Sequence, residues 1–263
     1  MLGWNVLKRL IVIVALIVCV ASVLGGSIYW KDRIDRTAKL SSQESTAAVS
    51  VDDTSGTMSD KAVDKLPGSL KKVVRQAQKD GRPVQLTLVG GGNVRGLAPL
   101  LQERLNQAFG ELFFKVTPID VGHVTSLEFN RTKAKELFKN IDKKPDAVIF
   151  FPLLYNDDHQ VSTDDSETVT SMFEEKVKLA YPKVAFFVTL PNYSSNEPYM
   201  NERIDDLALS LREKKLDSID YLSKWPKGSK RNRVVEKDGH TMNESGRQLW
   251  IDAVADQWHL RKD

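Results

Sequence analysis

The sequence predicts an α/β fold, in which a parallel sheet of about five strands lies between two layers of helices. Short apolar runs of strand character alternate with longer stretches whose apolar residues recur at helical spacing. The strands are separated by helices rather than by tight turns, as parallel pairing requires. Strands are expected at 84–89, 113–119, 147–151, 183–190 and 218–221, and helices at 69–79, 97–109, 130–139, 167–178, 199–215 and 244–257.

The first predicted strand, Val84–Val89, runs directly into three glycines, Gly90, Gly91 and Gly92, which precede a helical segment. In an open parallel sheet, ligands and nucleophiles lie at such junctions, beyond the carboxyl ends of the strands. Because these ends meet at one edge of the sheet, several turns are expected to converge on a single site. They are the turns after Val89, Ile119, Phe151 and Leu190.

The N-terminal region predicts a membrane anchor. Residues 10–30 form an uncharged, mostly apolar run, and Lys8 and Arg9 precede it. A helix of about 20 apolar residues crosses a bilayer core, whereas the apolar region of a cleaved signal peptide, the alternative, usually has about 7–15. We therefore expect a single-pass anchor at 10–30, with residues 1–9 cytoplasmic and the domain extracytoplasmic. Residues 31–65, rich in Ser, Thr and Asp, are expected to form a flexible tether, and 66–263 the folded domain.

Composition excludes several classes of function. The formal net charge is +3, from 38 basic and 35 acidic residues, which is too small to indicate a nucleic-acid partner. The single cysteine, Cys19, lies in the apolar run, and the four histidines are scattered, so no metal site is expected. The glycine turn could bind an anion, but GGGNVRG lacks the full dinucleotide spacing and the lysine of a phosphate-binding loop. No cofactor is therefore predicted.

Four segments of the chain together carry a family resemblance. LVGGGNVRG, VGHVTS, PDAVIFFPLLYND and DGHTMNESGRQLW occur in this order, and the chain resembles the SGNH (GDSL-type) hydrolases, particularly a membrane-anchored branch from Gram-positive bacteria. The resemblance covers roughly Val84 to Trp258 and implies a flavodoxin-like three-layer α/β/α sandwich. In that family a serine attacks an ester carbonyl, a glycine and an asparagine donate to the oxyanion, and an Asp-x-x-His supplies the base.

The resemblance assigns roles to individual positions. The nucleophilic serine falls on Gly92, which has no side chain, and the two oxyanion donors fall on Gly122 and Asn156. The aspartate falls on Asp238, whereas the histidine position holds a threonine, and His240 stands one residue early. The candidate catalytic residues are therefore Asp238 and His240. The candidate oxyanion or ligand-binding residues are Gly92, Gly122 and Asn156.

Several of these residues also have simpler structural interpretations. Asn156 with Asp157, and Asp238 with Gly239, are typical of turns and caps. Thr125 and Ser126 could replace the missing nucleophile, but helix capping is the more common role of such residues. The basic segment WPKGSKRNR is typical of a solvated surface, although it could contact an anionic polymer. It contains Lys227, Lys230, Arg231 and Arg233.

Two functions from different classes follow. The absent serine favours a catalytically impaired pseudoenzyme that binds or scaffolds cell-envelope components, such as cell-wall glycan or an acylated ligand. The alternative is an atypical esterase or acyltransferase that acts on acyl esters of cell-surface glycan or lipid. It would use a relocated nucleophile or a water molecule activated by His240.

Overall fold

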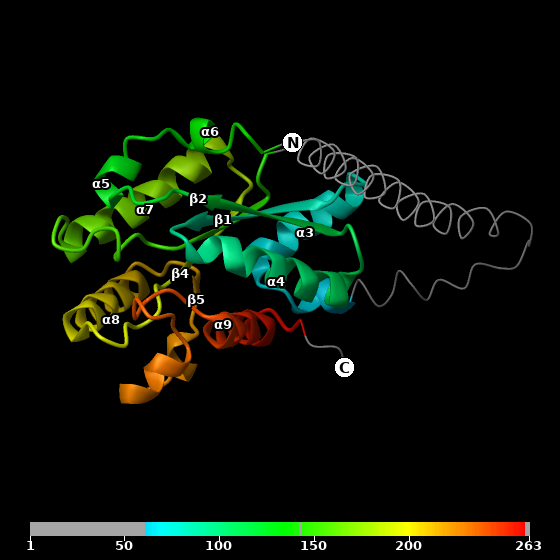
Figure 1. Cartoon of the computed structure of the whole chain (residues 1–263). Helices are drawn as coiled ribbons and strands as arrows, with labels where there is room; N and C mark the ends of the chain where they lie inside the picture. The colour runs from blue at the N-terminus through cyan, green and yellow to red at the C-terminus, as the bar shows by residue number, and fades with distance from the viewer. Residues whose placement is uncertain (1–60, 142–143, 261–263) are drawn as a thin grey trace, which may run out of the picture. The chain divides into compact units, whose positions relative to one another are not determined.

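The computed structural model describes residues 61–141 and 144–260. Five parallel strands form one sheet in the order β2-β1-β3-β4-β5 (Figure 1). This arrangement confirms the predicted α/β class and the five-stranded parallel sheet. The strands are β1 (Val84–Gly90), β2 (Phe114–Asp120), β3 (Ala147–Phe150), β4 (Ala185–Thr189) and β5 (Ser218–Ile219).

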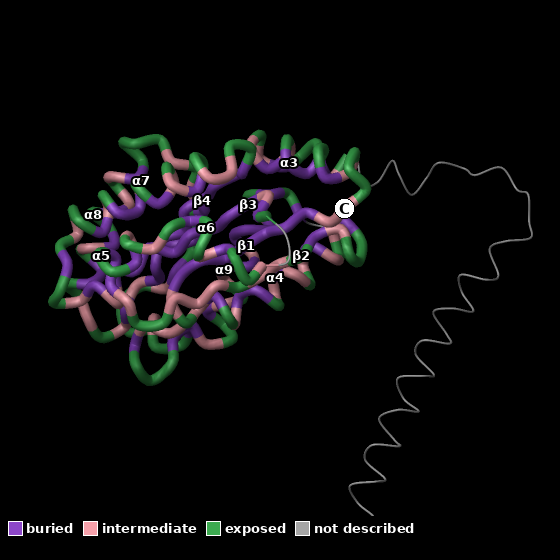
Figure 2. Tube along the Cα trace, turned by 90° about the horizontal axis from the view of Figure 1, so that it is seen from above, coloured by how far each residue is buried: buried purple, intermediate pink, exposed green. Residues whose placement is uncertain are grey.

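Helices cover both faces of the sheet. Figure 2 shows α4 and α9 on one face and α3, α7 and α8 on the other. The α-helices are α3 (Gly68–Lys79), α4 (Asn93–Phe109), α5 (Ser126–Phe129), α6 (Ala134–Leu137), α7 (Thr163–Ala180), α8 (Pro198–Glu213) and α9 (Glu244–Gln257). Two 3₁₀ turns, η1 (Leu222–Lys224) and η2 (Gly228–Arg233), follow β5.

The strand order by itself identifies the edge of the sheet at which a ligand is expected. After β1 the chain crosses through α4 to β2 on one side, and it then returns to β3 on the other side of β1. Right-handed crossovers in opposite directions leave a crevice between the carboxyl ends of the two strands where the order reverses. The glycine turn lies at this switch point, at the end of β1.

Apolar side chains of the central strands form the core. Every residue of β1, β3 and β4 is buried, whereas the edge strand β2 is mostly half-exposed. On one face four phenylalanines pack together and join α5, β3, α7 and β4, with ring centroids 4.7–5.8 Å apart. Such contacts favour tilted and edge-on geometries, which several of these pairs adopt. The four are Phe129, Phe150, Phe173 and Phe186.

The helix predicted at 130–139 is only partly present. Within this range the structure has α6 at Ala134–Leu137, and the separate short helix α5 ends just before the range, at Phe129. The start of α5 is fixed by a capping box between Thr125 and Glu128. At its end, the carbonyl and side-chain oxygens of Asn130 accept hydrogen bonds from Lys176 on α7. This tertiary contact favours the break, and periodicity does not reveal it.

The N-terminal predictions lie mostly outside the described residues. These include the anchor at 10–30 and the tether up to residue 60. Val63 and Leu66 both belong to the core, so packed structure begins slightly before the expected domain start at residue 66. Within 61–141 and 144–260, no helix has the length and apolar character needed to cross a membrane.

A buried carboxylate joins the loops that follow β2 and β3. Asp157, with 0% exposure, accepts hydrogen bonds from the backbone N–H and hydroxyl of Ser126, at 2.6 and 2.5 Å, and from the hydroxyl of Ser166 at 2.5 Å. A buried carboxylate is tolerated only when its oxygens are paired in this way. Asp157 therefore fixes α5 and α7 relative to the carboxyl edge of the sheet.

Replacing Asp157 with alanine is expected to destabilise the domain by roughly 2–4 kcal/mol, because it leaves the buried donors of Ser126 and Ser166 without an acceptor. Urea denaturation followed by circular dichroism measures this loss. The matched control is Asp206→Ala on the exposed face of α8, which should change the free energy of unfolding by less than about 0.5 kcal/mol. Equal stability of the two variants would contradict the proposed role of Asp157.

Candidate functional site

A cavity of about 250 Å³ opens at the switch point, at the carboxyl edge of the sheet. Segments from five parts of the chain contribute to it, namely the turns after β1, β2, β3 and β4 and the loop before α9. The expected convergence of these turns is therefore present. Among the predicted site residues, Gly92, Gly122, Asn156 and His240 line the cavity.

The glycine turn contains no side chain that could attack a substrate. Gly92 is the N-cap residue of α4, with φ −49° and ψ −27°, and an added Cβ would meet no atom within 4 Å. Gly90 differs, because a Cβ there would lie 2.6 Å from the Cβ of Phe151. Close packing therefore requires glycine at position 90, whereas neither backbone conformation nor space requires it at position 92.

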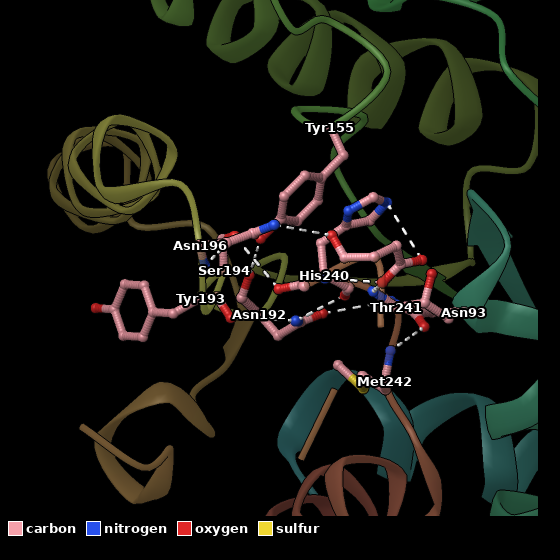
Figure 3. Close-up of polar contacts among 11 residues, drawn as sticks. Asn93, Tyr155, Asn192, Tyr193, Ser194, Asn196, His240, Thr241 and Met242 are labelled. Carbon is pink, nitrogen blue, oxygen red and sulfur yellow. Dashed lines mark hydrogen bonds and ion pairs between the residues drawn. The ribbon is translucent and has the colours of Figure 1, made fainter. Parts of the chain in front are cut away.

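His240 lies beside Asp238, as in a base with its carboxylate partner. Its Nε2 is 3.8 Å from Asp238 Oδ2, and its ring stacks on Tyr155 with centroids 4.7 Å apart (Figure 3). The Nδ1 atom is buried and has no hydrogen-bond partner, although the side chain as a whole is 38% exposed. The imidazole therefore contacts the carboxylate only loosely.

Asp238 is held chiefly by its own loop. Its Oδ1 accepts the backbone N–H groups of His240 and Thr241, at 3.0 and 2.9 Å, which is the geometry of an Asx turn. The side chain of Thr241, at the family's histidine position, also hydrogen-bonds to this carboxylate. Burial raises the pKa of Asp238, but these hydrogen bonds outweigh it, so the pKa lies below its ordinary value.

The two expected oxyanion donors already have acceptors within the protein. The N–H of Gly122 donates to Asp120 Oδ1 at 2.8 Å. Asn156 Nδ2 donates to the carbonyl oxygens of Gly122 and Val124, at 2.9 and 2.8 Å. Since a side-chain amide has only two N–H donors, neither remains for an oxyanion. In this structure Gly122 and Asn156 therefore hold the loop after β2 through these hydrogen bonds.

The carboxylate of Asp120, at the end of β2, also lines the cavity. The side chain of Asp120 is 12% exposed, and its Oδ2 lies 2.7 Å from Arg95 Nε. A neighbouring carboxylate disfavours the charge that develops on the carbonyl oxygen of a tetrahedral intermediate, whereas catalysis needs preorganised donors. Asp120 therefore brings an ion-paired carboxylate, rather than a hydrogen-bond donor, to the cavity.

A network of amides, which the sequence did not reveal, holds the last loop against the glycine turn (Figure 3). The buried Asn192 donates through Nδ2 to the carbonyl of His240 at 2.8 Å. Its Oδ1 accepts from Asn93 Nδ2 at 3.3 Å, and Asn93 Oδ1 accepts from the N–H of Met242 at 2.9 Å. Tyr155 donates to the carbonyl of Asn192 at 2.7 Å. In the sequence, the only indication of this role for Asn93 and Asn192 is that they follow β1 and β4 closely.

The other nucleophile candidates are structural. Thr125 caps α5, and the hydroxyl of Ser126 is buried against Asp157. Neither residue lines the cavity. These positions confirm the capping interpretation of Thr125 and give Ser126 a place in the core.

The basic segment after β5 includes one residue with a structural role. The guanidinium of Arg231 donates to the carbonyl oxygens of Pro226 and Ser194 and lies over the ring of Tyr193, at 4.7 Å. Lys227, Lys230 and Arg233 are exposed.

In the part of the chain that the structure describes, no group of three acidic, histidine or cysteine residues could hold a metal ion.

Comparison with known proteins gives structural likeness without sequence likeness. No protein-family model matches the chain, and no curated protein matches it significantly in sequence. A peptidoglycan O-acetylesterase aligns with a TM-score of 0.58 at 9% identity, over 73% of this chain and 95% of its own. A family 3 carbohydrate esterase from Talaromyces cellulolyticus aligns with 0.54 at 16%, over 66% and 95%.

A GDSL-like lipase from Parabacteroides merdae gives the same TM-score, 0.54, at 14% identity, over 68% of this chain and 97% of its own. The domain has the SGNH-hydrolase fold. The expected fold is thereby confirmed. At these identities the likeness extends to the fold alone and assigns no activity.

Gly92→Ser is expected to fold with unchanged or slightly higher stability, within about 1 kcal/mol, because its backbone is helical and its Cβ meets open space. Gly90→Ser should instead lose about 1–3 kcal/mol through overpacking against Phe151. Thermal and urea unfolding of the two matched variants measure the difference. The reverse order of stabilities would show that the turn is packed differently.

Thr241→Val removes a hydroxyl donor, so the pKa of Asp238 is expected to rise toward its ordinary value near 3.8. A carboxylate with a lowered pKa stabilises the folded state above the unfolded-state value, and this contribution is lost as pH falls through the folded-state pKa. As pH falls below the ordinary pKa of 3.8, the variant should therefore lose less stability than the wild type. Carbon-13 NMR titration of the carboxyl measures the pKa, with Thr168→Val on exposed α7 as control. An unchanged Asp238 pKa would disprove the role of the hydroxyl.

Proposed function

We propose that this protein is a catalytically impaired SGNH-hydrolase-like protein that uses the carboxyl-edge cavity to bind a ligand. The observation that carries the proposal is Gly92, which leaves the nucleophile position of the fold without a side chain. Removing the nucleophile of a triad leaves only the weak catalysis due to substrate binding and the oxyanion hole.

The surrounding residues support the same conclusion independently. Gly122 and Asn156 donate their hydrogen bonds to the protein, and Asp120 contributes a carboxylate to the cavity. An active acyl-transfer site needs the opposite arrangement, with donors directed at the developing negative charge. Loss of the nucleophile is therefore accompanied by loss of the electrostatic machinery.

The ligand that we propose is an acylated glycan of the cell envelope. Two structural neighbours are described as a peptidoglycan O-acetylesterase and a carbohydrate esterase, and these names support a carbohydrate ester as the ligand. The cavity is small, and its lining combines apolar residues such as Phe151 and Leu153 with the polar Asn156 and His240, which suits a short acyl group on a sugar rather than a long chain. The predicted anchor would hold the domain at the outer face of the membrane.

An atypical esterase is the alternative that one observation favours. His240 keeps a carboxylate partner at 3.8 Å and lines the cavity, so it could activate a water molecule. The missing donors argue against efficient turnover by this route. A direct measurement of turnover separates the two functions.

The full chain, incubated with 4-nitrophenyl acetate and a fluorophosphonate probe, is expected to show no labelling and no turnover above background. Gly92→Ser should fold but remain inactive, because restoring the hydroxyl does not restore the oxyanion donors. An active SGNH esterase serves as the assay control. Turnover that disappears in His240→Ala would establish the esterase and refute the pseudoenzyme.

Binding is tested with an O-acetylated muropeptide and its deacetylated form, titrated calorimetrically into the full chain. The acetylated form should bind more tightly, and Gly92→Leu, which places a large side chain at the cavity, should weaken binding at least about tenfold. Gly68→Leu is the matched control, since a Cβ there also meets open space. Equal affinity of wild type and Gly92→Leu would refute the assignment of the cavity.

A further inference from the structure

A larger hollow lies at the opposite edge of the sheet, where the strands begin. Its volume is about 1020 Å³, against about 250 Å³ for the carboxyl-edge cavity. Three segments form most of it: residues 69–76 of α3, residues 144–146 before β3, and residues 180–184 between α7 and β4. We call it the amino-edge pocket. Its size corresponds to the upper part of the range of small-molecule sites.

Apolar side chains form one wall of the amino-edge pocket. Val73 and Val184 are 7% and 9% exposed, and Pro145 is also buried. Ala180 and Tyr181 continue this wall. The ring of Tyr181 packs edge-on against Phe138, with centroids 5.7 Å apart, which fixes its orientation. The wall is therefore preformed, and it is suited to a hydrocarbon chain rather than to a strongly hydrated ligand.

The inner cation of the pocket is neutralised within the protein. Arg82 donates to both carboxylate oxygens of Asp146, at 2.7 and 2.9 Å, and also lies 3.3 Å from Asp80. Asp146 further accepts the backbone N–H of Gln85 at 2.8 Å, which holds the pair in place. A bidentate pair of this kind leaves little charge for a ligand. Arg82 therefore has a structural role.

Three exposed lysines around the pocket remain without an acidic partner among the described residues. Lys72 projects from α3, Lys144 precedes β3, and Lys183 precedes β4. They come from three separate segments, so their charges surround one opening rather than following one solvated helix face. Lysine binds carboxylates and phosphates as a flexible point charge. The rim thus favours an anionic group next to an apolar wall.

We infer that the amino-edge pocket binds a single-chain amphiphile with an anionic head group. The acyl or alkyl chain lies along the wall formed by Val73, Tyr181 and Val184, and the head group pairs with the lysines of the rim. A carboxylate and a phosphate monoester share the chemistry that this rim recognises. The carboxyl-edge cavity has about a quarter of the volume and no lysine among its lining residues, so it does not offer an equivalent site.

The experiment uses the full chain in phosphatidylcholine nanodiscs and a palmitate that carries a diazirine in its chain. After irradiation, mass spectrometry maps the labelled residues, and labelling is expected within 180–184. Decanoate and decyl phosphate, added separately, should compete and identify the preferred head group, whereas decyl maltoside should not. Replacing all three rim lysines with glutamine should reduce this labelling about tenfold, and Ala180→Trp, which fills the pocket without changing charge, should abolish it.

The matched control is a triple lysine-to-glutamine variant in the exposed segment after β5, at Lys227, Lys230 and Lys237. It removes the same charge elsewhere and should leave labelling of 180–184 unchanged. Three results would overturn the inference: label confined to other peptides, competition by decyl maltoside equal to that by decanoate, or undiminished labelling in the rim variant. Retained thermal unfolding temperatures of both triple variants exclude misfolding as the cause of any loss.

Discussion

The loops at the carboxyl edge of the sheet must satisfy one another's hydrogen bonds, and this constraint shapes the rest of the site. Parallel strands bring their connecting loops together at one edge, where backbone groups that no ladder pairs are crowded and partly buried. Asn156 donates hydrogen bonds to two carbonyls of the loop after β2. Asn192 donates to one carbonyl of the loop before α9, and Asn93 accepts one N–H of that loop. These side-chain amides therefore hold the loops in place.

Under the proposed function, this constraint explains why the site would lose its catalytic features together. A hydrolase must leave donors unsatisfied in the resting state, at a cost in stability, so that they can bind an oxyanion. Here the N–H of Gly122 has Asp120 as acceptor, and Asn156 has two carbonyls. Once no serine depends on these donors, pairing them internally stabilises the loops. Under the proposed function, the cavity at the switch point would thus persist as a ligand site without acyl-transfer chemistry.

The two ends of the sheet differ in what their surfaces offer. The cavity at the carboxyl edge is small and its polar groups are paired within the protein, whereas the amino edge combines an apolar wall with three lysines that have no acidic partner among the described residues. At the amino edge Asp146 neutralises the charge of Arg82 inside the pocket. The lysines of the rim therefore determine the sign of the pocket's net charge. Two ligands of different chemistry are therefore compatible with one domain.

The sequence by itself determined the sheet, the alternation of strands and helices, and the turns that meet at one edge, because apolar periodicity and glycine placement are local properties of the chain. It also showed that the glycine turn offers no nucleophilic side chain, since Gly90, Gly91 and Gly92 have none in any fold. It did not determine where α5 ends, because Lys176 reaches Asn130 from a distant helix. Only the tertiary structure decided whether Gly122 and Asn156 were available as donors and where the three rim lysines would meet. Hydrogen-bond partners and surface charge clusters depend on which distant segments are brought together, and no local pattern records that.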